Sequence, residues 1–324
     1  MIEKEVQELL SFIDGNPTAY HTTASVRNIL LNAGFSELLE SRRWQGSLSG
    51  CRTRTAGRPD GRRSFFFCRN GSSILAFRVG EQLENYSFNV AAAHTDSPCF
   101  RIKENAEIHM GQKYTKLNTE GYGGMICSTW MDRPLSVAGR VLIKENDAIT
   151  SRLLTLDRDL LMIPSVAIHM NRSANDGMKY QANVDTVPLF SGEDPDAAIL
   201  SMAAEAAGVR PEDVLGQDLF LYCRGRGTVL GAHGEYILSP KLDDLACVWG
   251  CLQGFLSAGV EPPGRSERFE RGVSDTLLDV VRGQAVVVHR GVVGGHHTGE
   301  QIHLVQLIGG IQVHIDHHRL CDAA

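Results

Sequence analysis

The feature that most constrains the fold is a change in the pattern of apolar and turn-forming residues at about residue 100. Before it, apolar residues recur at helical spacing over residues 2–13 and again after Thr18. From residue 100 to about 235 the chain consists of short β-rich pieces separated by Gly, Pro and Asn. A run of this kind predicts a β domain of its own. Residues 245–255 return to helical spacing, so we expect an α/β part combined with a β-rich part.

Composition excludes several classes of protein. The 324 residues suffice for two domains or one large one. The net charge of -6 and the absence of a Lys/Arg cluster give no surface for nucleic acid. No apolar run reaches the roughly 20 residues that cross a bilayer, and the acidic start MIEKEVQELL is not a secretory signal. The eight Cys form no CxxC pair. We therefore expect a cytoplasmic protein whose partners include neither nucleic acid nor a membrane.

A possible metal ligand stands at the end of an apolar run. NYSFNVAAA runs out at His94, and Asp96 and Pro98 follow. A His at the carboxyl end of a parallel strand lies where open α/β sheets bind their ligands, and imidazole is the commonest metal ligand. A nearby acid can hold the second ring nitrogen and fix the tautomer, with Thr95 turned away. A His–Asp pair that only hydrogen-bonds a turn explains the same pattern, so the motif alone does not decide.

A second acidic motif, Asp243-Asp244, stands directly before the helix expected over residues 245–255. Either aspartate can cap that helix, because Asp is a favoured N-cap residue. Alternatively, Asp243 bridges two metal ions, which together lower the pKa of a shared water and polarise a carbonyl group. Both interpretations are open on the motif alone.

Several segments in order resemble the M18 family of metallopeptidases, the aspartyl aminopeptidase-like enzymes. They are HTDSPCFRIK, YGGMICSTWMDRPLSVAGRV, PSVAIHMNR and SPKLDDLACVWGCLQGF. NPTAYHTTASVRNILLNAGFSEL and NGSSILAFRVG resemble the family as well, so the likeness covers roughly residues 5–256. It implies an α/β fold, in which a zinc-peptidase domain is interrupted by an inserted β-rich assembly domain. The implied division is 1–98 for the first part of the peptidase domain, 99–234 for the oligomerisation domain and 235–324 for the second part, which is atypical from about residue 258.

The resemblance also implies an activity and a set of site residues. It implies a dinuclear zinc (Zn²⁺) aminopeptidase that removes N-terminal, often acidic, residues from peptide substrates and that forms a homo-oligomer. Matched by motif, His94 is a metal ligand, Asp96 is the catalytic Asp behind it, and Asp243 is the bridging metal ligand. His169, in AIHMNR, resembles a family His that reaches the active site of a neighbouring subunit and binds substrate there. The alternative for His169 is a His bonded to backbone at a strand end.

The sequence after residue 256 departs from the family pattern. Family members continue to a Glu-Glu pair, a general base followed by a metal ligand, and then to a later Asp and His. This chain has no Glu-Glu dipeptide there, and Glu300, Asp316 and the tail His match no motif. No Phe, Tyr or Trp follows Phe269, and seven of the twelve His lie between residues 289 and 318. Either the tail is a shifted reading frame, or its HIDHH segment is a new metal-binding sequence.

This departure predicts a weak or absent activity. A catalytic zinc ordinarily has three protein ligands, and general base catalysis alone contributes about 10²–10⁴ in rate. With His94 and Asp243 alone, we expect poor zinc binding and little hydrolysis. We also expect missing central strands to leave an open sheet edge. Two other functions stay open: a non-catalytic oligomeric assembly protein, and a dinuclear zinc deacylase acting on N-acyl amino acids.

Overall fold

The structure is a computed structural model, and it describes residues 2–44, 63–79, 87–192, 194, 196–258 and 279–289. The described residues all belong to one compact unit. They form two large sheets, one five-stranded and one six-stranded, and a separate two-stranded hairpin. This mixture of helices and sheets agrees with the α/β fold class expected from the sequence.

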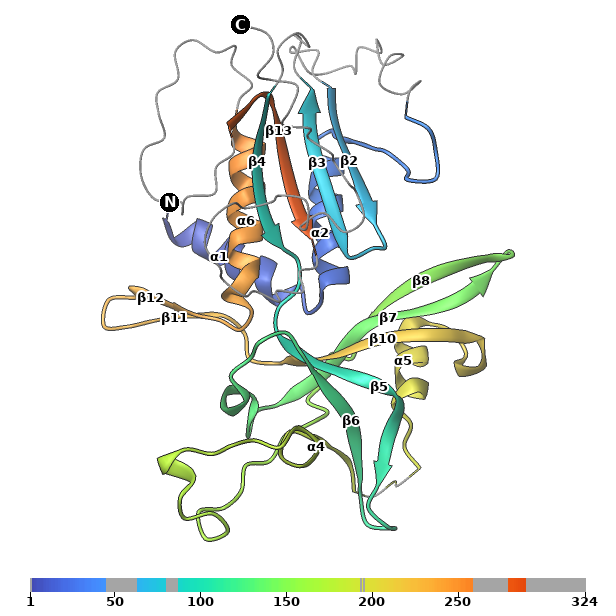
Figure 1. Ribbon diagram of the computed structural model, residues 1–324, viewed down its shortest axis with the longest axis vertical. Helices are drawn as coiled ribbons and strands as arrows, with labels where there is room; N and C mark the ends of the chain where they lie inside the picture. The colour runs from blue at the N-terminus through green and yellow to red at the C-terminus, as the bar shows by residue number, and fades with distance from the viewer. Residues whose placement is uncertain are drawn as a thin grey trace, which may run out of the picture. The chain divides into compact units, whose positions relative to one another are not determined.

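The five-stranded sheet has the order β1-β2-β3-β13-β4 (Figure 1). Its strands are β1 (Ser36–Glu37), β2 (Arg63–Arg69), β3 (Ser73–Val79), β4 (Ser87–His94) and β13 (Asp279–His289). The Asn70-Gly71 pair is a strong hairpin signal in the sequence, and β2 and β3 do form a hairpin in which Arg69 pairs with Ser73. Asn70 and Gly71 both have positive φ. β4 runs parallel to β13, so His94 does stand at the carboxyl end of a parallel strand.

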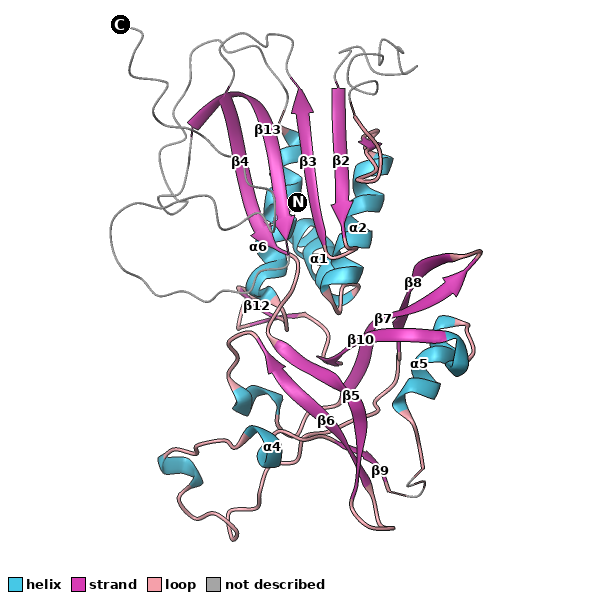
Figure 2. Cartoon of the chain, turned by 45° about the vertical axis from the view of Figure 1, so that its right-hand side comes forward, coloured by secondary structure: helices cyan, strands magenta, loops and turns pink. Residues whose placement is uncertain are grey.

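Three helices pack on this sheet and share one core with it (Figure 2). They are α1 (Ile2–Asp14), α2 (Ala19–Asn32) and α6 (Leu242–Ser257). The buried core contributors include Phe12, Ile13, Val26, Leu30, Phe66, Leu245, Val248, Leu252 and Phe255. Thr18 is the N-cap residue of α2, but its side chain makes no capping bond and instead contacts His21 Nδ1 at 2.8 Å. Among the described residues, no helix is both long and apolar enough for a membrane span.

The six-stranded sheet, in the order β8-β7-β10-β5-β6-β9, is formed by the interval expected to be β-rich. Its strands are β5 (Cys99–His109), β6 (Thr115–Tyr122), β7 (Leu135–Glu145), β8 (Ala148–Thr155), β9 (Leu189–Ser191) and β10 (Val214–Cys223). The same interval holds α4 (Ala182–Asp185), α5 (Ile199–Ala207) and the 3-10 turns η1 (Cys127–Trp130), η2 (Ala174–Asp176) and η3 (Pro211–Asp213). At its end lies the hairpin of β11 (Thr228–Leu230) and β12 (Tyr236–Leu238). A second core, which includes Leu117, Val137, Val141, Ile199 and Leu219, lies against this sheet.

One sequence expectation is wrong, and one strand was not predicted from its sequence. The segment PSVAIHMNR, residues 164–172, was expected to be β-rich, but it contains no strand and runs as irregular chain with a turn over residues 168–170. The Val and Gly repeats of QAVVVHRGVVGGHH fit neither the helical nor the strand period, but residues 284–289 of this segment belong to β13, which lies between β3 and β4. Within the described residues β4 is the last strand of this sheet and pairs with β13 alone, so the expectation of an open sheet edge stays a prediction. The polar, Arg-rich residues 41–63 predict turns around one short strand, but residues 45–62 lie outside the described residues. Glu300, Asp316 and HIDHH lie outside them as well.

Candidate metal centre

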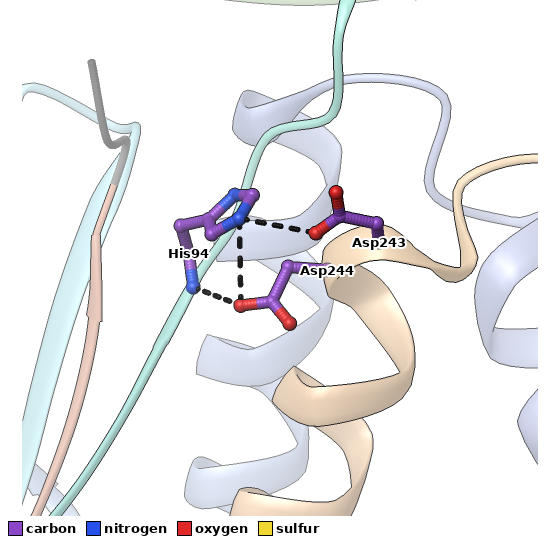
Figure 3. Close-up of side chains that lie close together, drawn as sticks. All are labelled: His94, Asp243 and Asp244. Carbon is purple, nitrogen blue, oxygen red and sulfur yellow. Dashed lines mark hydrogen bonds and ion pairs between the residues drawn. The ribbon is translucent and has the colours of Figure 1, made fainter. Parts of the chain in front are cut away.

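Three ligand-type side chains from distant parts of the sequence meet at one point (Figure 3). His94 is the last residue of β4, and Asp243 and Asp244 lie in the first turn of α6. Nε2 of His94 is 3.4 Å from Oδ1 of Asp243 and 3.7 Å from Oδ2 of Asp244. All three ligand atoms lie within 4.8 Å of one another.

These spacings fit one zinc ion. Zinc binds imidazole nitrogen and carboxylate oxygen at about 2.0–2.2 Å, so neighbouring ligand atoms of a tetrahedral site lie about 3.3–3.6 Å apart. The separations from His94 Nε2 to the two carboxylates, 3.4 and 3.7 Å, are of this size. Within the described residues, this is the one group of three or more His, Cys, Asp or Glu side chains close enough to hold a metal.

Asp96 supports the imidazole from its other side. Nδ1 of His94 lies 3.1 Å from Oδ1 of Asp96 and 3.0 Å from the Asp96 carbonyl oxygen. Asp96 is buried. When Nδ1 carries the proton and donates it to Asp96, the lone pair of Nε2 faces Asp243 and Asp244. The structure therefore brings His94, Asp96 and Asp243 together, although β4 and α6 are separated by most of the chain.

Backbone hydrogen bonds fix the junction between β4 and α6. The backbone N–H of His94 donates to Oδ2 of Asp244 at 2.8 Å, and Oγ of Ser97 donates to the carbonyl oxygen of Asp243 at 2.8 Å. Thr95 does turn away from the site, since its hydroxyl donates to the Ser72 carbonyl oxygen at 2.8 Å. Thr95 and Ser97, which follow His94 in the motif, are thus held by different parts of the chain.

Neither aspartate caps α6, contrary to one of the two interpretations of the motif. The N-cap position is Lys241, in the left-handed region at φ 59°, and no side chain makes a capping bond there. Asp243 and Asp244 have non-helical φ and ψ, and the peptide bond between them is cis. Their carboxylates face Nε2 of His94, at 3.4 and 3.7 Å.

The two aspartates differ in exposure and in charge environment. The side chain of Asp243 is 82% exposed, whereas that of Asp244 is 12% exposed. The hydrogen bond to Asp96 and the negative charge of Asp244 raise the pKa of His94 to about 9, although burial acts in the opposite direction. A site that favours a positive charge this strongly suits a cation, and Asp243 is the carboxylate that remains accessible to one.

The structure also shows what the sequence did not predict. His169 lies in an exposed turn and does not belong to the group of three ligand-type residues. Tyr122, in a motif quoted only for the family likeness, donates its hydroxyl to Oδ2 of Asp96. The Asp-Asp dipeptide drew attention to Asp244, but nothing in the sequence predicted the hydrogen bond between Asp244 and the His94 backbone. Nothing predicted the contact of Tyr122 with Asp96 either, because the two residues lie 26 positions apart in the chain.

The family model for the aminopeptidase I zinc metalloproteases (M18) matches residues 12–264 of this chain. The chain is 36% identical over 264 residues to a probable M18 family aminopeptidase 2 of Clostridium novyi (strain NT), covering 79% of this chain and 58% of that protein. It is 35% identical over 260 residues to a protein of the same name from Pseudomonas aeruginosa (strain LESB58), covering 78% of this chain and 57% of the relative. The chain therefore spans less than two thirds of the length of these curated relatives.

Solved structures show the same fold. The cryo-EM structure of the Ape4 and Nbr1 complex matches with a TM-score of 0.72 and 27% identity, over 88% of this chain and 54% of that one. The structure of Chaetomium thermophilum mApe1 matches with a TM-score of 0.70 and 26% identity, over 87% of this chain and 61% of that one.

Proposed function

Because the chain belongs to the M18 family of aminopeptidase I zinc metalloproteases, we propose that it derives from a zinc aminopeptidase that removes N-terminal residues, acidic ones included, from peptides. The observation that supports this proposal most strongly is the convergence of His94 and Asp243, with Asp96 behind the imidazole. A His and an acid from two remote motifs face each other at a distance that one metal ion can span.

Each residue has a defined task in this proposal. Nε2 of His94 and the exposed carboxylate of Asp243 would hold zinc, and Asp243 would be the ligand shared with a second ion. Asp96 keeps the proton on Nδ1 of His94, which leaves Nε2 free to coordinate. Bound zinc supplies a Lewis acid that polarises the scissile carbonyl and lowers the pKa of water. Asp244 holds the His94 backbone and so fixes the distance between the two ligands.

The domain division belongs to the same proposal. Residues 1–98 and 235–324 provide the peptidase part, and residues 99–234 provide an inserted domain for homo-oligomerisation. The inserted interval exposes several large apolar side chains, each 59–81% exposed: Ile126, Ile149, Met170, Val184 and Leu215. Exposed apolar groups of this kind support burial between subunits. His169 precedes Met170 in its exposed turn, where it is accessible to the substrate site of a neighbouring subunit.

We place the protein in the cytoplasm. The six cysteines that the structure describes are all free thiols, which suits a reducing compartment. Cys68 and Cys251 are partly buried, and burial raises the pKa of both thiols, so they remain protonated and unreactive at neutral pH.

Hydrolysis by a polypeptide of these 324 residues should be weak. The sequence after residue 256 has no Glu-Glu dipeptide, to which the family resemblance assigns the general base and a metal ligand. Without a general base, a loss of about 10²–10⁴ in rate is expected. The described residues provide a starting set of ligands rather than a full dinuclear site.

Zinc content and peptidase activity test the two parts of this proposal separately. Zinc per chain is measured by elemental analysis for the wild type, His94→Ala and Asp243→Ala, with His109→Ala, outside the metal group, as the control. We expect zinc to be lost in the first two variants only, and aspartyl-naphthylamide to be hydrolysed slowly. Equal zinc content in all four proteins contradicts the metal centre. Two tightly bound zinc ions and rapid turnover contradict the weak activity.

A further inference from the structure

Strand β6 ends at the metal centre although it belongs to the other sheet. Its last residue, Tyr122, pairs with Cys99 at the start of β5, three positions after Asp96. The Tyr122 hydroxyl donates a hydrogen bond to Oδ2 of Asp96. A side chain of the six-stranded sheet thus touches the acid that supports His94, which lies at the end of a strand in the five-stranded sheet.

Asp96 uses its two oxygens for two different partners. Oδ1 faces Nδ1 of His94 at 3.1 Å, and Oδ2 accepts from Tyr122. Asp96 is 7% exposed, so water competes little for either oxygen. Hydrogen bonds to an ionised acceptor are stronger than those between neutral groups. A carboxylate held at both oxygens cannot rotate freely, so the direction of Oδ1 towards the imidazole is fixed.

Tyr122 is itself held in place by its surroundings. Its ring packs edge-on against Phe220 of β10, with centroids 6.1 Å apart and an interplanar angle of 72°. The next residue, Gly123, has φ +76°, and a Cβ there would lie 3.4 Å from Cα of Pro98. This conformation favours glycine, and it ends β6 directly against the segment that carries Asp96. The hydroxyl position is therefore set by packing before any metal binds.

We propose that Tyr122 is a positioning residue of the metal centre, which holds Asp96 so that His94 presents Nε2 to the ion. The effect of Tyr122 on metal binding rests on the proposed function, because it requires a metal at His94. The hydrogen bond that couples Tyr122 to Asp96 is independent of the proposed function. A direct consequence is that the β-rich part of the chain contributes to metal affinity through Tyr122, although Tyr122 does not itself bind the metal.

Metal titration tests the inference with a matched tyrosine as control. Co²⁺ binding is measured by calorimetry and by its visible absorption for wild type, Tyr122→Phe and Tyr222→Phe. Tyr222, in β10 of the same sheet, is also partly buried, but its hydroxyl donates to the Leu156 carbonyl oxygen at 3.2 Å. Loss of an outer-shell partner weakens metal binding about 10–100-fold, and we expect about tenfold for Tyr122→Phe. We expect no change for Tyr222→Phe.

A double-mutant cycle separates positioning from a general structural effect. In an Asp96→Ala background the path from Tyr122 to His94 is absent, so Tyr122→Phe should no longer change Co²⁺ affinity. A loss of the same size in both backgrounds overturns the inference, and so does wild-type affinity in Tyr122→Phe. Circular dichroism checks that each variant is folded, and Asp96→Leu, which has a similar size and no hydrogen-bond acceptor, replaces Asp96→Ala if the alanine variant unfolds.

The four proteins of the cycle, which are the wild type, Tyr122→Phe, Asp96→Ala and the double variant, are then unfolded with urea in the absence of metal. We expect the effects of the Tyr122 and Asp96 substitutions on stability to be non-additive, because each removes the same hydrogen bond. Additive effects overturn the coupling whatever the metal does. If His94→Ala leaves Co²⁺ binding unchanged, the proposed metal centre fails instead, so the two failures are distinguishable.

Discussion

Metal binding at His94 should depend steeply on pH well above the usual range of a histidine. The hydrogen bond to Asp96 and the charge of Asp244 raise the pKa of His94 to about 9 in the metal-free protein. Metal requires the unprotonated Nε2, so protons and metal compete for the same nitrogen. Because the pKa is raised, the competing proton is present throughout the neutral range and is lost only as the pH rises through about 9.

The size of the effect follows from this pKa. With a pKa of about 9, about 1% of His94 is unprotonated at pH 7. The apparent affinity at pH 7 is then about 100-fold below its limit at high pH, and it rises about tenfold for each pH unit below the pKa. Each ion that binds at neutral pH should release about one proton from this residue.

Calorimetric titration with Co²⁺ between about pH 6.5 and 8.5 measures both quantities, with buffers of different ionisation enthalpy to count the protons. Asp96→Asn removes the largest cause of the raised pKa, so in that variant the steep region should shift towards the ordinary histidine pKa. The reasoning is refuted if wild-type affinity is constant over this range and no proton is released.

Three further predictions concern stability. Gly139→Ala places a Cβ 2.0 Å from the Asp218 carbonyl oxygen, so this overpacking should lower the free energy of unfolding in urea by about 1–3 kcal/mol or more. The control Gly216→Ala, whose added Cβ would have its nearest contact at 3.9 Å, should change the free energy of unfolding little. Leu252 is 1% exposed in the core of α6, so Leu252→Ala should cost about 2–5 kcal/mol, and an unchanged melting temperature contradicts that packing. Burial, with Lys241 nearby, lowers the pKa of His21 to about 4. The unfolded chain therefore binds a proton between pH 6.5 and 4 that the folded chain does not, so stability should fall by about 2–3 kcal/mol as the pH drops through this window, and His21→Gln should reduce that dependence.

Local sequence signals predicted the elements whose structure is determined locally. The Asn70-Gly71 pair specified a hairpin because few other residues adopt positive φ at both turn positions. The β-rich interval was predictable for a similar reason, since its turn residues mark each strand end. β13 was missed because its sequence shows no alternation of apolar and polar residues, which is the usual signal of a strand.

The candidate site was only partly predictable. The family likeness identified His94, Asp96 and Asp243 through their motifs, and the structure places them in contact. The motif did not indicate that the Asp244 carboxylate accepts the His94 amide. Tyr122 could not be predicted, because its contact with Asp96 depends on the pairing register of β5 and β6 and on where β6 ends.

The most direct measurement is an anomalous diffraction map at the zinc absorption edge, from crystals grown with Zn²⁺. A peak about 2.0–2.2 Å from both Nε2 of His94 and a carboxylate oxygen of Asp243 is the predicted result. Zinc bound elsewhere on the protein, with nothing between these two side chains, would contradict it.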